Sequence, residues 1–239
     1  MESIKAYLDE QVARINVPLF IESDPVKFVH RYARLQDVEI VAFAVATIAW
    51  GKRETILRDA TRMLDQLGSS PYDYVMGGGY RRLGTANVHR TFFEQDLAAM
   101  LHGFHEILAS HDSLEAYLHT CLGEQAEGGV EANAWNIAPR LRLPYNVEKS
   151  ALKRVNMALR WLVRTDGIVD LGVWKFIDPS RLYIPLDVHV ANTARQLGLL
   201  RRKSNDRKAV EELTARLRDF CPEDPVKYDF ALFGLGVEK

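Results

Sequence analysis

Apolar residues recur at intervals of three and four along most of the chain. This spacing places them on one face of a helix, whereas the alternation at intervals of two that marks a half-buried strand is rare. The pattern therefore predicts an all-α fold. The predicted helices span residues 2–15, 37–50, 54–67, 93–108, 112–122 and 130–141.

The longest strongly patterned segment is NVEKSALKRVNMALRWLVRTDG, residues 146–167, which ends at a glycine suited to a helix C-cap. One stripe of this predicted helix is apolar. A second stripe, at intervals of four, three, four and four, carries Lys149, Lys153, Asn156, Arg160 and Arg164. Such a row is either a solvated helix face or an edge that contacts nucleic-acid phosphates. No acid interrupts the row after its first lysine, which favours phosphate contact.

Two segments, residues 69–84 and 124–134, are rich in Gly, Pro, Ser or Asn and are expected to be loops. Neither is long enough to be a flexible linker between domains, and the sequence has no internal repeat. The expected organisation is one compact all-α domain over residues 1–239. It is either undivided or bilobed, with a cleft between a lobe built from both chain ends and a central lobe.

Composition and charge narrow the function classes. The 239 residues are 47% hydrophobic and 26% charged, as in an ordinary folded protein. Lys and Arg number 31 against 32 acidic residues, so attraction to a polyanion depends on how the cations are arranged. Two cysteines, Cys121 and Cys221, are too few for a disulfide framework, a four-thiolate zinc site or a cysteine-held iron–sulfur cluster. No metal and no cofactor is expected.

The N-terminal residues are charged and lack the apolar core of a signal peptide. The longest apolar run, IVAFAVATIAW, is about half of the ~20 residues that a membrane helix needs. We therefore expect a soluble cytoplasmic protein without a membrane partner.

The stretch IPLDVHVANTARQLGLL is predicted to open a helix at Asp187, just after Pro185. As a plain N-cap, Asp187 would stabilise the helix by ~1 kcal/mol. Alternatively, Asp187, His189, Asn192 and Arg195 form a polar group around the positive end of the helix, with the carboxylate held ionised and aimed outward. The stretch alone leaves both interpretations open.

Four blocks of the sequence, in the right order, resemble the helix-hairpin-helix DNA glycosylases. PLDVHV followed by ARQLGL is similar to their aspartate-bearing segment, above all in the 8-oxoguanine-releasing branch. KSALK or KRVNM resembles the lysine-bearing start of the second hairpin helix, and VATIAWGKRETILRDATRML resembles an early helix–turn–helix whose turn faces DNA. KYDFALFGLG resembles the closing helix of the adenine-releasing members. The whole chain also resembles an uncharacterised bacterial family, a distant relative of this superfamily, which implies a location in the bacterial cytosol or nucleoid.

The sequence departs from the superfamily at the hairpin. The usual LPGVG is replaced by LPYN in LPYNVEKS, so both hairpin glycines are missing and the hairpin is degenerate. The interval of 34 residues between Lys153 and Asp187 is longer than in the common branch and closer to that of the archaeal 8-oxoguanine enzymes. The four-cysteine iron–sulfur loop of some relatives is absent.

The resemblance implies a catalytic role for Asp187 and for one lysine. The carboxylate would stabilise the oxocarbenium-like state of the sugar and take a proton from the nucleophile. A neutral lysine amine would attack the anomeric carbon and form a Schiff base that permits strand cleavage. Lys153 is the preferred nucleophile because a cationic neighbour follows it, and Lys149 is the alternative.

The resemblance also implies residues that contact DNA. The turn of the early helix–turn–helix, Trp50, Gly51, Lys52 and Arg53, would meet DNA, with Trp50 as a wedge and the two cations as phosphate clamps. His189 would contact a phosphate or the extruded base. Trp161, Trp174 and Phe176 are further ring candidates for a base pocket. For each of these aromatic residues, packing in the core is the competing interpretation.

Three functions are weighed. The first is a DNA glycosylase that releases a damaged base, such as an oxidised purine, from duplex DNA, with AP-lyase activity through the lysine. The second is a non-catalytic nucleic-acid-binding protein of the same fold, which the missing hairpin glycines favour. The third is an α-helical interaction protein without a nucleic-acid partner.

Overall fold

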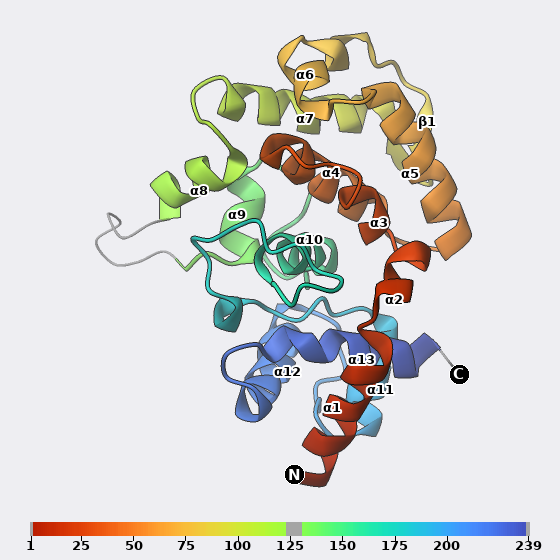
Figure 1. Ribbon diagram of the computed structural model, residues 1–239, viewed down its shortest axis with the longest axis vertical. Coiled ribbons are helices and arrows are strands. Elements are labelled where there is room, and N and C mark those ends of the chain that lie inside the picture. The colour runs from red at the N-terminus through yellow and green to blue at the C-terminus, as the bar shows by residue number, and fades with distance from the viewer. Residues whose placement is uncertain (1, 123–130, 238–239) are drawn as a thin grey trace. The chain divides into compact units, whose positions relative to one another are not determined.

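The computed structural model describes residues 2–122 and 131–237, and its regular secondary structure is almost entirely helical (Figure 1). The predicted all-α fold is confirmed. Within these residues the strands form one antiparallel pair, β1 (Asn87–His89) and β2 (Phe92–Phe93). The α-helices are α1 (Glu2–Ile15), α2 (Pro18–Ser23), α3 (Val26–Val29), α4 (Leu35–Ile48), α5 (Arg53–Leu67), α6 (Pro71–Met76), α7 (Glu94–Leu108), α8 (Leu114–Leu122), α9 (Ala134–Arg140), α10 (Lys153–Val163), α11 (Val188–Gln196), α12 (Arg207–Phe220) and α13 (Tyr228–Val237). Three short 3-10 helices are η1 (Gly79–Arg82), η2 (Pro179–Arg181) and η3 (Pro225–Lys227).

The chain divides into two compact units. Unit 1 comprises Met1–Glu22, Asn133–Trp135 and Asn146–Lys239, and unit 2 comprises Ser23–Ala132 and Asn136–Tyr145. In unit 1, α13 packs against α1 and α11. The Tyr228 hydroxyl donates a hydrogen bond to Asp9 Oδ1 at 3.0 Å, which ties the last helix to the first.

Unit 2 is built around α4, which is buried from Asp37 to Ile48. A helix that is apolar on nearly all sides is suited to the centre of a core. Two acids of α4, Asp37 and Glu39, are buried. The two carboxylate oxygens of Glu39 accept the backbone amides of Leu114 and Glu115 at 2.9 and 2.8 Å. This negative charge therefore lies at the positive N-terminus of α8, where the exposed amide groups favour it.

Unit 1 contains α10, which is shorter than the predicted helix over residues 146–167. At its start, the Asn146 side chain accepts the Glu148 amide in a turn, and Leu152 has a left-handed backbone with φ +46°. At its end, the amides of Leu171 and Trp174 donate to the carbonyl oxygens of Trp161 and Leu162. The chain thus folds back onto the last carbonyl groups of α10, which stops the helix before Gly167.

The predicted loop over residues 69–84 is wrong in part, because it contains α6 and η1. Ser70 accepts the Asp73 amide as an N-cap, and Pro71 occupies the first helical turn. Both signals are present in the sequence. The other predicted loop, residues 124–134, lies outside the described residues as far as residue 130. No described helix is both long and apolar enough to cross a lipid bilayer.

Candidate functional site

Asp187 is the N-cap of α11. Its Oδ1 accepts the Val190 amide at 2.9 Å, so the N-cap prediction is confirmed. The preceding Pro185 and Leu186 are buried and fix the path of the chain into the helix. The Asp187 carboxylate itself is half-buried, and its second oxygen accepts no hydrogen bond from the described residues. The cap therefore positions one oxygen and leaves the other available to a ligand.

The two candidate lysines differ in their surroundings. Lys153 is the first residue of α10 and is half-buried. Lys149 lies in the turn before the helix and is exposed, and its carbonyl oxygen accepts the Arg207 amide at 3.1 Å. Only Lys153 thus belongs to a regular element and is partly shielded from water, two conditions that favour a positioned amine.

Asp229, on α13, is a buried acid whose pKa is affected by the charges of both Lys153 and Asp187. It is 6% exposed and forms an ion pair with Arg160. Burial raises the pKa of Asp229 to about 6; the positive charges of Arg160 and Lys153 oppose this shift, and the negative charge of Asp187 adds to it. Asp187 and Lys153 therefore both lie close enough to Asp229 to affect its ionisation. The preferred nucleophile and the candidate carboxylate thus have opposite electrostatic effects on one buried acid.

Sequence reasoning missed Asp229. The signal that could have found it is local, because this acid is the second residue of an otherwise apolar helix, YDFALFGLGV. An acid in such a context is buried only if it is paired or takes part in the chemistry of a site.

A network of buried ion pairs surrounds the far half of α10. Arg160 is 4% exposed and contacts Asp229 and, through Nε at 3.2 Å, Asp170 Oδ1. Arg164 is 3% exposed and donates to Asp170 Oδ2 and Asp224 Oδ2, both at 2.9 Å. Burial opposes the charge of Arg164, but Asp170, Asp224 and the neighbouring Asp166 together raise its pKa. Both guanidinium groups are therefore charged and held inside unit 1.

This network shows that the predicted phosphate-contacting row is wrong for three of its members. Arg160 and Arg164 face buried carboxylates, and Asn156 is 2% exposed and donates to the Ala151 carbonyl oxygen at 3.1 Å. The alternative of a solvated face is wrong for the same residues. A cation row looks identical in sequence whether it faces water or acids contributed by other segments.

The predicted ring candidates are also corrected. Trp161 and Trp174 are fully buried, so neither is available to an extruded base. Phe176 is half-buried and lies against Trp174, with ring centroids 6.0 Å apart. Packing in the core, the competing interpretation, is thus shown for both tryptophans.

His189 and Asn192 lie on α11 and are exposed. His189 Nδ1 lies 3.1 Å from the Gly236 carbonyl oxygen, which requires that this nitrogen carry the proton and donate it. The hydrogen bond orients the imidazole ring of His189, which lies two residues after Asp187. A DNA-contacting role for both residues stays a prediction.

Trp50, Gly51, Lys52 and Arg53 belong to unit 2 and form the turn from α4 into α5. Trp50 is half-buried, and its ring meets the edge of His89 at a centroid distance of 4.6 Å. Gly51 has φ +101°, a backbone conformation that residues with a side chain rarely adopt. Lys52 is exposed. The helix–turn–helix is present, and its contact with DNA stays a prediction.

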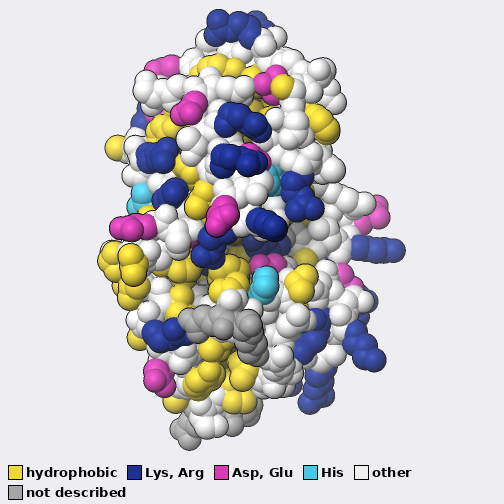
Figure 2. Space-filling view, turned by 90° about the vertical axis from the view of Figure 1, so that its right-hand side faces the viewer, with side chains coloured by type: hydrophobic (Ala, Val, Ile, Leu, Met, Phe, Trp, Pro, Cys, Tyr) yellow, Lys and Arg dark blue, Asp and Glu magenta, His cyan; other side chains and the backbone are white. Residues whose placement is uncertain are grey.

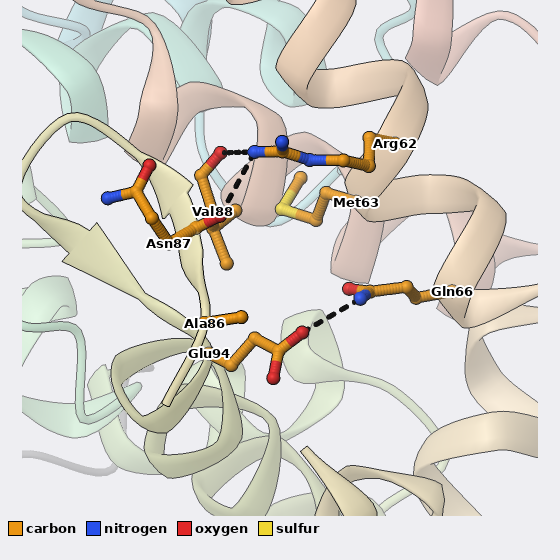
Figure 3. Close-up of a pocket in the computed structure, with 7 residues that line it drawn as sticks. All are labelled: Arg62, Met63, Gln66, Ala86, Asn87, Val88 and Glu94. Carbon is orange, nitrogen blue, oxygen red and sulfur yellow. Dashed lines mark hydrogen bonds between the residues drawn. The ribbon is translucent and has the colours of Figure 1, made fainter. Parts of the chain in front are cut away.

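A shallow pocket of about 130 Å³ lies in unit 2 beside α5 and β1 (Figure 3). Arg62 and Glu94 line it, and none of the predicted catalytic or DNA-binding residues does so. Across residues 2–122 and 131–237, no group of three or more His, Cys, Asp or Glu side chains is arranged to hold a metal ion.

The raised pKa of Asp229 predicts a specific pH dependence of stability. Its value of about 6 lies above the ordinary 3.8, so the folded protein binds this proton more tightly than the unfolded chain. The stabilisation from this tighter proton binding is fully present when the pH is below the ordinary pKa of 3.8, and it is lost as the pH rises through about 6. The difference in unfolding free energy between wild type and Asp229→Asn should therefore fall by on the order of 3 kcal/mol from pH ~4 to ~6.5. Urea unfolding across this pH range measures it, and a constant difference would contradict the assignment.

Comparison of the chain with curated proteins and with solved structures finds no match. A family model described as "Protein of unknown function (DUF2400)" matches residues 24–238, which is most of the chain. The protein therefore belongs to the DUF2400 family.

Proposed function

We propose that this protein is a DNA glycosylase that releases a damaged base from duplex DNA, with Lys153 as the nucleophile and Asp187 as the catalytic carboxylate. The observation that carries the proposal is the arrangement around Asp229. An amine at the start of α10 and a carboxylate at the cap of α11, 34 residues apart in sequence, both act on this one buried acid.

The proposed base release assigns one chemical role to Lys153 and another to Asp187. The Lys153 amine, once deprotonated, attacks the anomeric carbon of the sugar, and the N-glycosidic bond breaks as the base leaves with the electron pair. Asp187 stabilises the positive charge that develops on the sugar and accepts the proton that the amine loses. The C1′–O4′ bond then breaks, O4′ takes up the proton that Asp187 accepted, and a Schiff base forms on Lys153. Loss of a C2′ proton from the Schiff base to water expels the 3′ phosphate with its electron pair and cleaves the strand, and the released base takes a proton from water.

The lesion class is supported by the resemblance of the segment around Asp187 to the 8-oxoguanine-releasing branch. We therefore infer an oxidised purine as the substrate. In this proposal His189, the second residue of α11, contacts the extruded base or its phosphate, and the Trp50–Arg53 turn contacts the DNA backbone.

Borohydride trapping tests which lysine is the nucleophile. Reduction of the Schiff base leaves a covalent protein–DNA complex on a duplex that contains 8-oxoguanine or another oxidised purine. Wild type and Lys149→Ala should both form the complex, and Lys153→Ala should form at least about 100-fold less, because no other positioned amine replaces the missing group. Lys208→Ala is a matched control, since Lys208 also lies in the first turn of a helix and is exposed.

The outcomes separate the competing functions. Trapping that survives in Lys153→Ala but disappears in Lys149→Ala would transfer the role to Lys149. A wild-type protein that binds the duplexes but neither releases a base nor forms the complex would be a non-catalytic nucleic-acid-binding protein. Absence of any DNA affinity would leave the α-helical interaction protein.

A further inference from the structure

We propose that three arginines of unit 2, Arg58, Arg62 and Arg90, form an arginine cluster that binds the phosphate backbone of duplex DNA. Arg58 and Arg62 lie one turn apart on α5, and Arg90 lies at the turn of the β1–β2 hairpin. The inference rests on the proposed function, because it names the surface that would hold the DNA of that reaction.

The cluster is exposed and is fixed to its scaffold. The side chains of Arg58 and Arg62 are 72% and 56% exposed. Arg62 Nη2 donates to the carbonyl oxygens of Asn87 and Val88 at 3.0 and 2.6 Å, as Figure 3 shows. These hydrogen bonds hold the guanidinium group in one place, so less side-chain entropy is lost when a phosphate binds.

Arg90 is held over the α4–α5 turn. Its backbone is left-handed, with φ +50°, and its carbonyl oxygen accepts the Asn87 side-chain amide at 2.6 Å. A Cβ atom on Gly51 would lie 2.6 Å from Arg90 Nη1, so the guanidinium group packs directly on this glycine. Because Gly51 has no side chain, Arg90 reaches the turn whose next residue is the exposed Lys52.

A buried acid, Asp59, holds the residues beneath the arginine cluster in place through hydrogen bonds. Asp59, whose side chain is 5% exposed, accepts Arg58 Nε at 3.0 Å and lies 2.8 Å from His89 Nδ1. Burial raises the pKa of Asp59, but the hydrogen bonds from His89 and Arg58 outweigh it and hold the pKa below its ordinary value. The other His89 ring nitrogen lies 2.7 Å from the Trp50 carbonyl oxygen. The carboxylate and the imidazole thus join α5, the hairpin and the turn beneath the arginines.

The arginine cluster is positively charged, and the exposed acids of α5 lie only at its two ends. The exposed acids of α5, Glu54 and Asp65, lie four residues before Arg58 and three residues after Arg62, at the two ends of the row. Figure 2 views the molecule from the side on which Figure 1 shows α5 and β1, and Lys and Arg side chains gather in the upper half of that view. Guanidinium groups bind phosphate oxygens through paired hydrogen bonds, which suits a backbone that passes over several of them.

A polyanion fits this surface better than a small anion. The pocket beside Arg62 also contains Glu94, whose carboxylate accepts Gln66 Nε2 at 2.9 Å and the Gly84 amide at 2.8 Å. These two hydrogen bonds lower the pKa of Glu94, so the pocket keeps a negative charge that repels a free phosphate. The arginines lie on the open surface instead, where an extended strand of phosphates reaches all three.

The test is the salt dependence of DNA affinity in the full chain. Fluorescence anisotropy with a labelled duplex, repeated over a series of salt concentrations, gives the slope of log affinity against log salt. Arg58→Gln/Arg90→Gln should weaken binding roughly tenfold or more at low salt and reduce the slope by about 2, because two phosphates no longer have a cationic partner. Arg58→Lys/Arg90→Lys keeps both charges and should keep most of the slope.

The matched control is Arg181→Gln/Lys208→Gln, which removes two exposed cations from unit 1 and should leave the slope unchanged. Circular dichroism melting checks that each variant folds, and the single Arg58→Gln, at a largely exposed position, gives half of the expected slope change if the double variant unfolds. An unchanged slope in the arginine variants, an equal reduction in the control, or no DNA affinity in wild type would overturn the proposal.

Base release measured on the same proteins separates this inference from the proposed function. A wild type that binds DNA with the expected slope but releases no base would sustain the arginine cluster and refute the glycosylase. A wild type that releases a base, with a slope that Arg58→Gln/Arg90→Gln leaves unchanged, would refute the arginine cluster alone.

Discussion

Asp187→Asn is expected to slow base release by at least about 100-fold, the usual effect when one group that stabilises a charged transition state is removed. Asn caps a helix about as well as Asp, so α11 keeps its first hydrogen bond and the free energy of unfolding should change by less than about 0.5 kcal/mol. The substitution thus removes the charge and keeps the cap. Single-turnover release of an oxidised purine, measured beside thermal unfolding, checks both expectations.

Asp206→Asn provides the matched control. Asp206 caps α12 as Asp187 caps α11, and its side chain accepts the Ala209 amide as that of Asp187 accepts the Val190 amide. The backbone angles also agree, with φ and ψ of −124° and −176° at Asp206 against −110° and −172° at Asp187. Base release should be unaffected in Asp206→Asn. Full activity in Asp187→Asn would reduce this carboxylate to a helix cap.

Arg164→Met is expected to destabilise unit 1 by about 3–5 kcal/mol, because the partly buried Asp224 loses its guanidinium partner and the buried Asp170 keeps only its ion pair with Arg160. Methionine fills a similar volume, so the destabilisation comes from the lost ion pairs and not from a cavity. Urea unfolding followed by tryptophan fluorescence reports on unit 1, which contains Trp161 and Trp174.

Two further variants serve as controls for the destabilisation expected in Arg164→Met. Arg216→Met, in the same unit, removes a half-exposed guanidinium whose partner Asp219 lies 3.8 Å away, and should cost less than about 1 kcal/mol. Adding Asp170→Asn to Arg164→Met removes one of the carboxylate charges that lost the Arg164 guanidinium and should recover part of the stability. A change below about 1 kcal/mol in Arg164→Met would mean that water or a rearranged partner satisfies the acids.

Most of the fold can be predicted from the helical periodicity of apolar residues and from local capping signals. Helices α1, α4, α5 and α7 begin and end within about two residues of their predicted bounds, because each depends on an apolar stripe that the chain itself displays. Asp187 was placed correctly for the same reason, since an N-cap is decided by the residues next to it.

The candidate site can be predicted from the sequence only in part, because its main features depend on contacts between segments that are distant in the sequence. Arg160 is paired with Asp229, 69 residues further along, and Arg164 with Asp224, 60 residues further along. Periodicity within one helix cannot reveal such partners, so buried cations and surface cations give the same pattern in the sequence. The start of α10 was misplaced by a related cause, because the left-handed Leu152 interrupts a segment of high helix preference.

The composition of unit 1 from both ends of the sequence has a consequence for synthesis on the ribosome. The segments of unit 2 emerge before α10 and can become compact early, whereas Asp224 and Asp229 are translated only after α12. Until then Arg160 and Arg164 lack Asp224 and Asp229, two of their four acidic partners, so α10 cannot be enclosed without a large desolvation cost. Synthesis of η3 and α13, which follow α12, is therefore the event that permits burial of the arginine-bearing helix.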